Sequence, residues 1–208
     1  MKLKKVAALC NSAAAYHLYD QVDSTGAVET QWLGDGSAAY PLHGLPYLSE
    51  QELYRMFDVP EKKQDKAYFD HGALPEALCV DDFCAGEQLA EDLDVTISYG
   101  GTVLLPLSYP GGLLYIQSRY LGPLEDQADL LQLYIRRTES GARYVAAKTG
   151  MLLVGIIFPY VHLRESFSAK LDEIAALTRR ELERSQAKRT AADAEDEDQE
   201  RFFGSAAE

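Results

Sequence analysis

MLLVGIIFPYV (residues 151–161) is nearly continuous in apolar residues, and three further runs of a similar kind lead up to it. These are LLYIQSRYLGPL (113–124), LQLYIRRT (131–138) and ARYVAAKT (142–149), which are rich in leucine, β-branched and aromatic side chains. Glycine or proline punctuates the runs, and apolar runs of this length between such breakers are typical of β-strands. Because the last run lacks polar alternation, we expect it to be a central strand covered on both faces.

The first part of the chain predicts a β-meander followed by a short helix. Strands are expected at 5–10, 15–22, 28–33 and 37–42, separated by glycine-containing turns. The helix is expected near 49–58, because Ser49 and Glu52 have the spacing of a capping box and Pro60 forbids continuation.

The middle of the chain is less regular. Residues 61–94 are polar and acidic, and they predict a short helix around 61–69 followed by a surface excursion. Residues 95–109 predict a hairpin around Gly100-Gly101. The segment from Ile116 to Asp129 is open to a second interpretation, a helical turn between two strands.

A change to helical periodicity marks the C-terminal part. Phe167, Leu171, Ile174 and Leu177 recur on one face, which predicts an amphipathic helix over about 164–188 that packs against the sheet. From residue 190 the chain holds alanines and acids without periodicity, so 190–208 is predicted to be a disordered acidic tail.

The predicted fold class is therefore α+β: a mainly antiparallel β-sheet body with a short helix near 49–58 and a long C-terminal amphipathic helix. Residues 1–189 are expected to form one domain. An internal echo also permits two similar halves, about 1–94 and 95–189. The echo consists of Leu18-Tyr19 and Leu133-Tyr134, each of which is followed by Gly-Ala, with the glycine seven residues after the tyrosine. Chance reuse of these residues in hairpins is the alternative.

Composition excludes several classes of protein. A hydrophobic fraction of 47% excludes global disorder. The net charge of −13 argues against broad non-specific binding to nucleic acid, although a local basic face is compatible with it. The longest apolar run is too short to span a bilayer, and the apolar stretch after the basic start ends too early for a signal peptide. We therefore expect a cytoplasmic protein.

The three cysteines indicate reduced thiols, because their odd number and irregular spacing do not form a disulfide framework. Cys79 and Cys84 are spaced as C-x4-C, and a zinc site there would need two more ligands, such as His71 and Asp82. The alternative, ordinary half-buried cysteines, is preferred, so no metal and no cofactor are predicted.

No catalytic residue is predicted. The histidines are His17, His43, His71 and His162, and they stand in no known catalytic motif. Trp32 is the sole tryptophan and lies beside a tight turn. It is a candidate for a partner-binding surface, with a core position on the sheet as the alternative.

The tail contains a second candidate for partner binding. Phe202 and Phe203 are its only large apolar residues, and an acidic segment with an aromatic anchor suits docking to a protein. A solvated tail without a partner is the alternative.

KLKKVAALC (2–10), QWLGDGSAAYPL (31–42) and MFDVPEKK (56–63) resemble pieces of uncharacterised proteins of bacterial prophages and integrating mobile elements. The resemblance covers the first third of the chain. It implies a phage or mobile-element context and no activity.

Three functions remain open at this point. The first is a non-enzymatic accessory protein that acts by protein binding or self-association, without a membrane. The second is a sliding-clamp-like accessory of DNA replication, the one hypothesis with DNA as partner. The third is a small-molecule or metal-dependent enzyme whose site no motif reveals.

Overall fold

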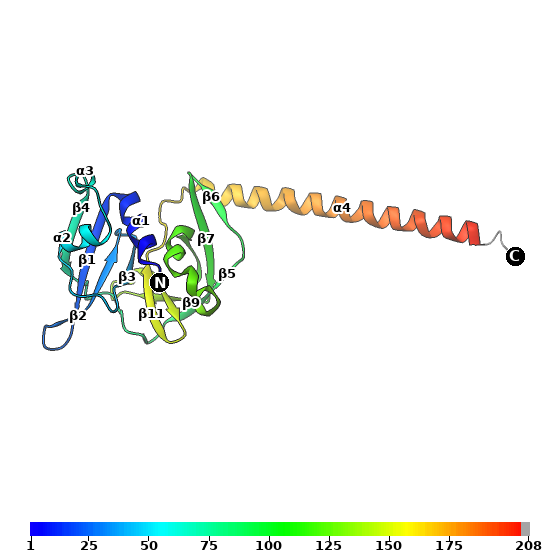
Figure 1. Cartoon of the computed structure of the whole chain (residues 1–208). Helices are drawn as coiled ribbons and strands as arrows, with labels where there is room; N and C mark the ends of the chain where they lie inside the picture. Colours follow the sequence, from blue (N-terminus) through cyan, green and yellow to red (C-terminus); the bar gives the residue numbers. More distant parts are fainter. Residues whose placement is uncertain (205–208) are drawn as a thin grey trace. The chain divides into compact units, whose positions relative to one another are not determined.

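The computed structural model describes the backbone of residues 1–204 and the side chains of residues 1–186. The chain divides into two compact units, Met1–Val161 and His162–Glu208. The first is a β-rich body, and the second contains one long helix (Figure 1). The fold class is α+β, as predicted.

The described residues of the body form an eleven-stranded, mostly antiparallel mixed sheet. Its strands are β1 (Ala15–Val22), β2 (Val28–Gly34), β3 (Ala38–Pro41), β4 (Tyr68–Ala73), β5 (Gln88–Asp92), β6 (Ile97–Tyr99), β7 (Thr102–Tyr109), β8 (Gly112–Gln117), β9 (Leu131–Arg137), β10 (Arg143–Thr149) and β11 (Leu152–Ile157). Their order across the sheet is β4-β1-β2-β3-β11-β10-β9-β5-β7-β6, and β8 pairs with β7. The helices are α1 (Leu3–Ala13), α2 (Glu50–Met56), α3 (Glu61–Gln64), the 3-10 helix η1 (Ser118–Leu130) and α4 (Ser166–Gly204).

The most apolar predicted strand lies at the centre of the sheet. β11 pairs with β10 on one side and with β3 on the other, where Ile156 lies opposite Ala39. Ile156 and Ile157 are both buried and belong to different core clusters. Because consecutive residues of a strand point to opposite faces, this strand is covered on both faces, which confirms the prediction.

β10 separates the two cores in the same way. Val145 and Ala147 belong to the larger cluster, whereas Tyr144 and Ala146 belong to the smaller one. The larger cluster receives residues from α1, α2 and η1, and the smaller one is covered by apolar residues of the segment after β4. Both faces of the sheet therefore obtain their cover from within the body.

α1 replaces the strand that we expected at 5–10, so that prediction is wrong. Val6, Ala7 and Cys10 are its buried residues, a spacing of one and then three that puts them on one face of a helix. The alanines of this segment also favour a helix. The buried face packs in the larger core, and α1 lies against η1.

Two strands occupy the region that we expected to be a helix and a surface excursion. α3 ends at Gln64, and the chain then forms β4 and, after a long loop, β5. β4 runs parallel to β1 with an unbroken register from Ala15 opposite Tyr68 to Asp20 opposite Ala73. Tertiary pairing determines this strand, because its sequence has no clear alternation.

Several local predictions are confirmed. Glu52 Oε2 accepts a hydrogen bond of 2.8 Å from the Ser49 backbone N–H, which completes the capping box of α2. The hairpin of β6 and β7 turns at Gly100-Gly101. The segment after Ile116 forms η1, in agreement with the second of its two interpretations.

α4 begins close to the predicted position, and the packing of its apolar face against the sheet stays a prediction. Ile174 is 59% exposed and Leu177 is 56% exposed. The body covers both faces of its own sheet, so its core does not require these side chains. The helix continues to Gly204, through a stretch for which we expected disorder. Among the described residues, no helix is long and apolar enough to cross a membrane.

Candidate functional site

The outer edge of β4 is the first feature of the body that suggests a function. In a parallel ladder, alternate residues of a strand direct both backbone groups to the same neighbour. The Tyr68 N–H donates to the carbonyl oxygen of Ala14, just before β1, and the Leu74 N–H donates to that of Asp20 in β1, each at 2.9 Å. The even-numbered residues of β4 therefore bond to β1. The backbone groups of Phe69, His71 and Ala73 point away from it, and no described strand pairs with them.

Aromatic and histidine side chains surround this edge on both faces of the sheet. On the core face, Phe69 contacts Tyr54 with 5.8 Å between ring centroids, and His71 lies next to Phe69. On the opposite face, Tyr68 is 58% exposed, and its ring lies 5.4 Å from that of His17. The edge therefore offers both backbone groups and exposed ring surface to a partner.

The Asp20 carboxylate ties the edge to the rest of the body. Its Oδ2 lies 3.0 Å from His71 Nε2 and accepts a hydrogen bond of 3.5 Å from the Tyr47 hydroxyl. Its Oδ1 accepts a hydrogen bond of 2.8 Å from Gln31 Nε2. Because His71 and Tyr47 meet at the same carboxylate oxygen, the group holds segments together. None of these described side chains is placed to relay a proton from His71 or from Tyr47.

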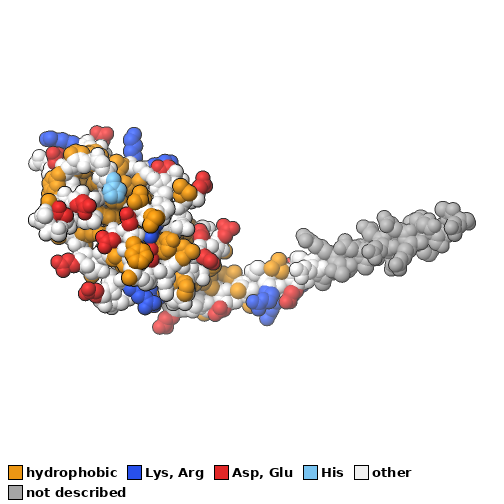
Figure 2. Space-filling view, turned by 90° about the horizontal axis from the view of Figure 1, so that it is seen from below, with side chains coloured by type: hydrophobic (Ala, Val, Ile, Leu, Met, Phe, Trp, Pro, Cys, Tyr) orange, Lys and Arg blue, Asp and Glu red, His pale blue; other side chains and the backbone are white. Residues whose placement is uncertain are grey.

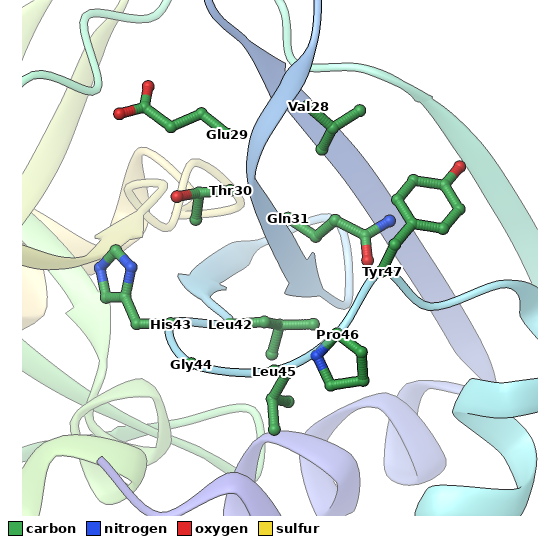
Figure 3. A pocket seen from close by; sticks show the side chains of 10 residues that line it. All are labelled: Val28, Glu29, Thr30, Gln31, Leu42, His43, Gly44, Leu45, Pro46 and Tyr47. Atoms are coloured by element: carbon green, nitrogen blue, oxygen red, sulfur yellow. The ribbon is translucent and has the colours of Figure 1, made fainter.

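A shallow pocket of about 190 Å³ lies beside this carboxylate, between β2 and the loop that follows β3 (Figure 3). β3 separates from β2 after the hydrogen bond of 2.7 Å from Leu42 N–H to Gln31 O. The pocket lies where the two strands diverge, with Val28 and Tyr47 on its rim and His43 across from them. Sites for small organic ligands usually have volumes of about 300–1,000 Å³, so this pocket is too small for most cofactors.

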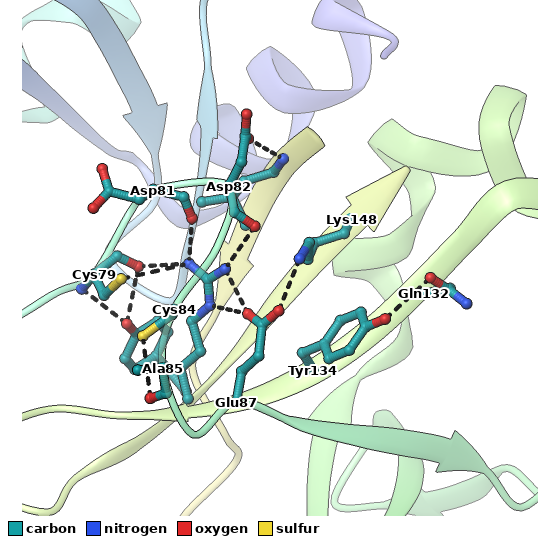
Figure 4. Close-up of polar contacts among 12 residues, drawn as sticks. Cys79, Asp81, Asp82, Cys84, Ala85, Glu87, Gln132, Tyr134 and Lys148 are labelled. Atoms are coloured by element: carbon teal, nitrogen blue, oxygen red, sulfur yellow. Dashed lines mark hydrogen bonds and ion pairs between the residues drawn. The ribbon is translucent and has the colours of Figure 1, made fainter. Parts of the chain in front are cut away.

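A buried ionic cluster, composed of Glu87, Arg136 and Lys148, lies elsewhere in the body (Figure 4). Glu87 Oε2 is 2.6 Å from Arg136 Nη2, and Glu87 Oε1 is 2.8 Å from Lys148 Nζ. The exposed fractions of the side chains are 0% for Arg136, 8% for Lys148 and 10% for Glu87. Burial opposes ionisation of Glu87. Hydrogen bonds from Lys148 and Arg136 outweigh burial and hold the pKa of Glu87 below its ordinary value.

The cluster fixes the loop between β4 and β5 on the sheet. Arg136 Nη1 donates to the carbonyl oxygens of Cys79 and Asp81 at 2.9 and 2.7 Å, and Nη2 donates to that of Asp82 at 3.3 Å. The Lys148 ammonium lies 4.7 Å from the centre of the Tyr134 ring. Every charged group of the cluster has partners, so its geometry is that of a structural clamp.

The sequence-predicted candidates occupy different places. Trp32 is buried in the smaller core and donates a hydrogen bond of 2.9 Å to Gln21 Oε1, so it lies in the core and not on a recognition surface. Phe202 and Phe203 lie outside the residues whose side chains are described. Cys79 and Cys84 lie together, but the described residues contain no group of three or more ligating side chains that could hold a metal ion.

Sequence reasoning missed the β4 edge because we did not expect β4 to be a strand. The adjacent aromatic residues Tyr68 and Phe69 were the available signal, since aromatic residues favour strands. It also missed the ionic cluster, because Glu87 and Arg136 are 49 residues apart and no motif joins them.

No protein-family model, no curated protein and no solved structure matches this chain.

Proposed function

We propose that this protein is a non-enzymatic accessory protein of a phage or mobile element that acts in the cytoplasm by assembly, and that two copies join through their β4 strands. The observation that supports this proposal is the unpaired outer edge of β4. The phage or mobile-element context comes from the sequence resemblance described above.

β4 lacks the features that usually protect an edge strand. Natural edges are shortened, covered, interrupted by proline or a bulge, or given lysine side chains. β4 has six residues, YFDHGA, without lysine or proline, and its pairing with β1 contains no bulge. The opposite end of the sheet differs: β6 has only three residues and is followed by two glycines. β4 is therefore the longer and less protected of these two ends, which supports pairing there.

The register of β4 suits a second copy of the chain. Two antiparallel β4 strands about a twofold axis can place His71 opposite His71 of the second copy and Phe69 opposite Ala73 of the second copy. These are the residues whose backbone groups point outward. On the other face, the same register places Asp70 opposite Gly72 of the second copy, so no two carboxylates meet. Like charges directly opposite each other would oppose pairing.

The size of the interface predicts a reversible dimer. The three facing residue pairs form two backbone hydrogen bonds each, and at about 0.5–1.5 kcal/mol net per bond they contribute roughly 3–9 kcal/mol. Lost translational and rotational freedom costs about 4–15 kcal/mol. The exposed Tyr68 ring adds apolar contact area beside the bonds. The gain exceeds the cost by at most about 5 kcal/mol, so we expect a weak monomer–dimer equilibrium with a dissociation constant in the range of about 0.1–1 mM.

Sedimentation velocity across this range of protein concentration tests the proposal. Ala73→Pro removes an outward backbone N–H without touching the bonds to β1, and it should abolish dimerisation. Ala73→Ser is the matched control, because it keeps the N–H at the same exposed position. Both variants should melt like the unmodified protein. The proposal fails if the protein is monomeric at every concentration, or if a well-folded Ala73→Pro variant dimerises as strongly as the control.

A sliding-clamp-like function is a second candidate, and the topology favours it. A helix followed by three antiparallel strands occurs twice, as α1-β1-β2-β3 and as η1-β9-β10-β11. β3 pairs with β11 where the two sets meet, and α1 contacts η1. This repeated arrangement favours a duplication, the interpretation of the sequence echo that was left open beside chance reuse.

The charge of these helices counts against binding to DNA. Lys2 and Lys5 of the N-terminal segment form ion pairs with Glu125 of η1, and the N-terminal ammonium pairs with Asp126 at 3.0 Å. These positive charges are neutralised within the protein and are not offered to phosphates. A mobility-shift assay with duplex DNA at low salt distinguishes the candidates, because a clamp-like function predicts salt-dependent retention and the assembly function predicts none.

A further inference from the structure

Cys79 and Cys84 lie together in the loop that connects β4 to β5. Both are half-buried, and the Cys84 thiol forms a hydrogen bond to Cys79. Figure 4 shows the Cys79 and Cys84 side chains close to each other, and Arg136 Nη1 lies 4.0 Å from Cys79 Sγ. The third cysteine, Cys10, is fully buried on α1 in the larger core.

The backbone around the pair is fixed by the sheet below it. The Tyr144 hydroxyl accepts a hydrogen bond of 2.9 Å from Cys79 N–H and donates one of 3.0 Å to Cys79 O. Arg136 binds the carbonyl oxygens of Cys79, Asp81 and Asp82, which span most of the loop between the two cysteines. The sulfur atoms are therefore held near each other before any bond forms, and the entropy cost of bringing them together is already met by folding.

A route for a small oxidant reaches the Cys84 side of the pair. A hollow of about 390 Å³ lies against Cys84 and is lined also by Gly86, Glu87, Arg136 and Arg137. Two arginine side chains line it, so it suits a small polar molecule. Cys10 is not among the residues that line this hollow.

We propose that Cys79 and Cys84 form a reversible thiol–disulfide pair, which a peroxide oxidises and a thiol reductant restores. The first step transfers an oxygen atom from hydrogen peroxide to one thiol and gives a sulfenic acid and water. The second thiol then attacks the sulfenic sulfur, the S–S bond forms, and a second water leaves. The two thiols lose two electrons together, and the peroxide gains both. A thiol reductant reverses the change by thiol–disulfide exchange.

The surroundings assign different parts to the two cysteines. Arg136 Nη1 lies 4.0 Å from Cys79 Sγ, within the distance of a weak hydrogen bond to the sulfur. Burial, together with the hydrogen bond to Cys79, raises the pKa of Cys84 to about 11. Cys84 therefore keeps its proton at neutral pH, and we assign it to the second step.

The consequence is a covalently closed loop over the smaller core. Leu78 and Val80 of this loop pack against that core, which contains Trp32 and Tyr144. Oxidation would close this cover covalently, because the Cys79 and Cys84 side chains already interact in the reduced protein. The inference does not depend on pairing of the β4 edge, so either proposal can fail alone.

Thiol counting and proteolysis on the full-length protein test the inference. After exposure of the folded chain to hydrogen peroxide, the number of free thiols measured in denaturant should fall from three to one. An endoproteinase that cleaves before aspartate cuts between the cysteines, at Asp81 and Asp82. The two fragments should stay joined after oxidation and separate when dithiothreitol is added.

Single cysteine variants provide the controls. Cys10→Ser should give the same joined fragments, with free thiols falling from two to none. Cys84→Ser should give no joined fragments and should leave Cys79 as a sulfenic acid that dimedone traps. Cys79→Ser should leave Cys84 unmodified under the same conditions. The proposal is overturned if all three thiols persist after oxidation of the folded chain, or if the fragments are joined through Cys10 or through a second chain.

Discussion

Replacing Glu87 by alanine removes the single carboxylate that binds two buried cations. Arg136 and Lys148 have no other carboxylate within ion-pair distance in the described part of the chain. The substitution therefore leaves two buried positive charges without a counterion. Removing one partner of a buried ion pair typically costs about 3–5 kcal/mol, because the remaining charge stays buried and unpaired.

That cost is large for a body of this size. Native domains are stable by about 5–15 kcal/mol, so Glu87→Ala should remove roughly a fifth or more of the free energy of unfolding. For a body of about 160 residues, 1 kcal/mol corresponds to roughly 2–4 °C, and the melting temperature should fall by about 6–20 °C. Replacing all three charged residues by apolar residues of similar volume should recover much of the loss, because no charge then remains buried.

The pH dependence of stability gives an independent check. The pKa of Glu87 is lower in the folded protein than its ordinary value of 4.5. Its contribution is therefore fully present above about pH 4.5 and is lost as the pH falls through the lowered folded pKa. The Glu87→Ala variant lacks this contribution at every pH, so the stability difference between the two proteins should shrink as the solution is acidified below about pH 4.5.

Urea denaturation followed by tryptophan fluorescence is a suitable assay, because the sole tryptophan, Trp32, lies in the core beneath the clamped loop. Glu76→Ala is the matched control, since Glu76 is an exposed acid in the same loop. The control should change stability by less than about 0.5 kcal/mol. A Glu87→Ala variant that unfolds within 1 kcal/mol of the unmodified protein would refute the assignment of Glu87 as the counterion of both cations.

Two further substitutions probe close contacts in the body. Gly34→Ala should cost more than about 3 kcal/mol or prevent folding, because the added Cβ would lie 1.8 Å from the backbone oxygen of Ala38. Gly72→Ala is the control, since its Cβ meets no atom within 4 Å and the variant should fold normally. Tyr40→Phe should cost about 1–3 kcal/mol, because the buried Tyr40 hydroxyl donates a hydrogen bond of 2.5 Å to Tyr120 O and the substitution leaves that oxygen unpaired. Both effects can be measured by urea denaturation, and a change below 0.5 kcal/mol in either would contradict the contact.

The strands of the central sheet were predictable because local signals agree with tertiary pairing. β2, β9 and β10 each lie within one residue of their expected bounds, whereas β11 begins one residue later and ends four residues earlier than the run at 151–161. α1 was not predicted, because six residues with mixed small and apolar side chains fit both a strand and a helix. Packing against η1 and the larger core decides between these states, and that information is not local.

The functional features were harder to predict, because each depends on residues that are distant in sequence. The Glu87 side chain gains its role from Arg136 and Lys148, which lie on β9 and β10. The spacing of Cys79 and Cys84 was visible in the sequence, but their contact depends on the carbonyl groups that Arg136 binds. A spacing alone cannot show whether two thiols share a fixed loop or move independently.

The repeated arrangement of a helix and three strands receives a different additional neighbour in each set. In both sets the first strand of the meander receives an additional neighbour: β4 joins β1, and β5 joins β9. β5 is antiparallel and also pairs with β7, so the sheet continues beyond it and ends at the three-residue strand β6. β4 is parallel and ends the sheet directly. The two sets thus differ at β4, where the first one exposes six residues of edge backbone, and the proposed assembly through β4 rests on this difference.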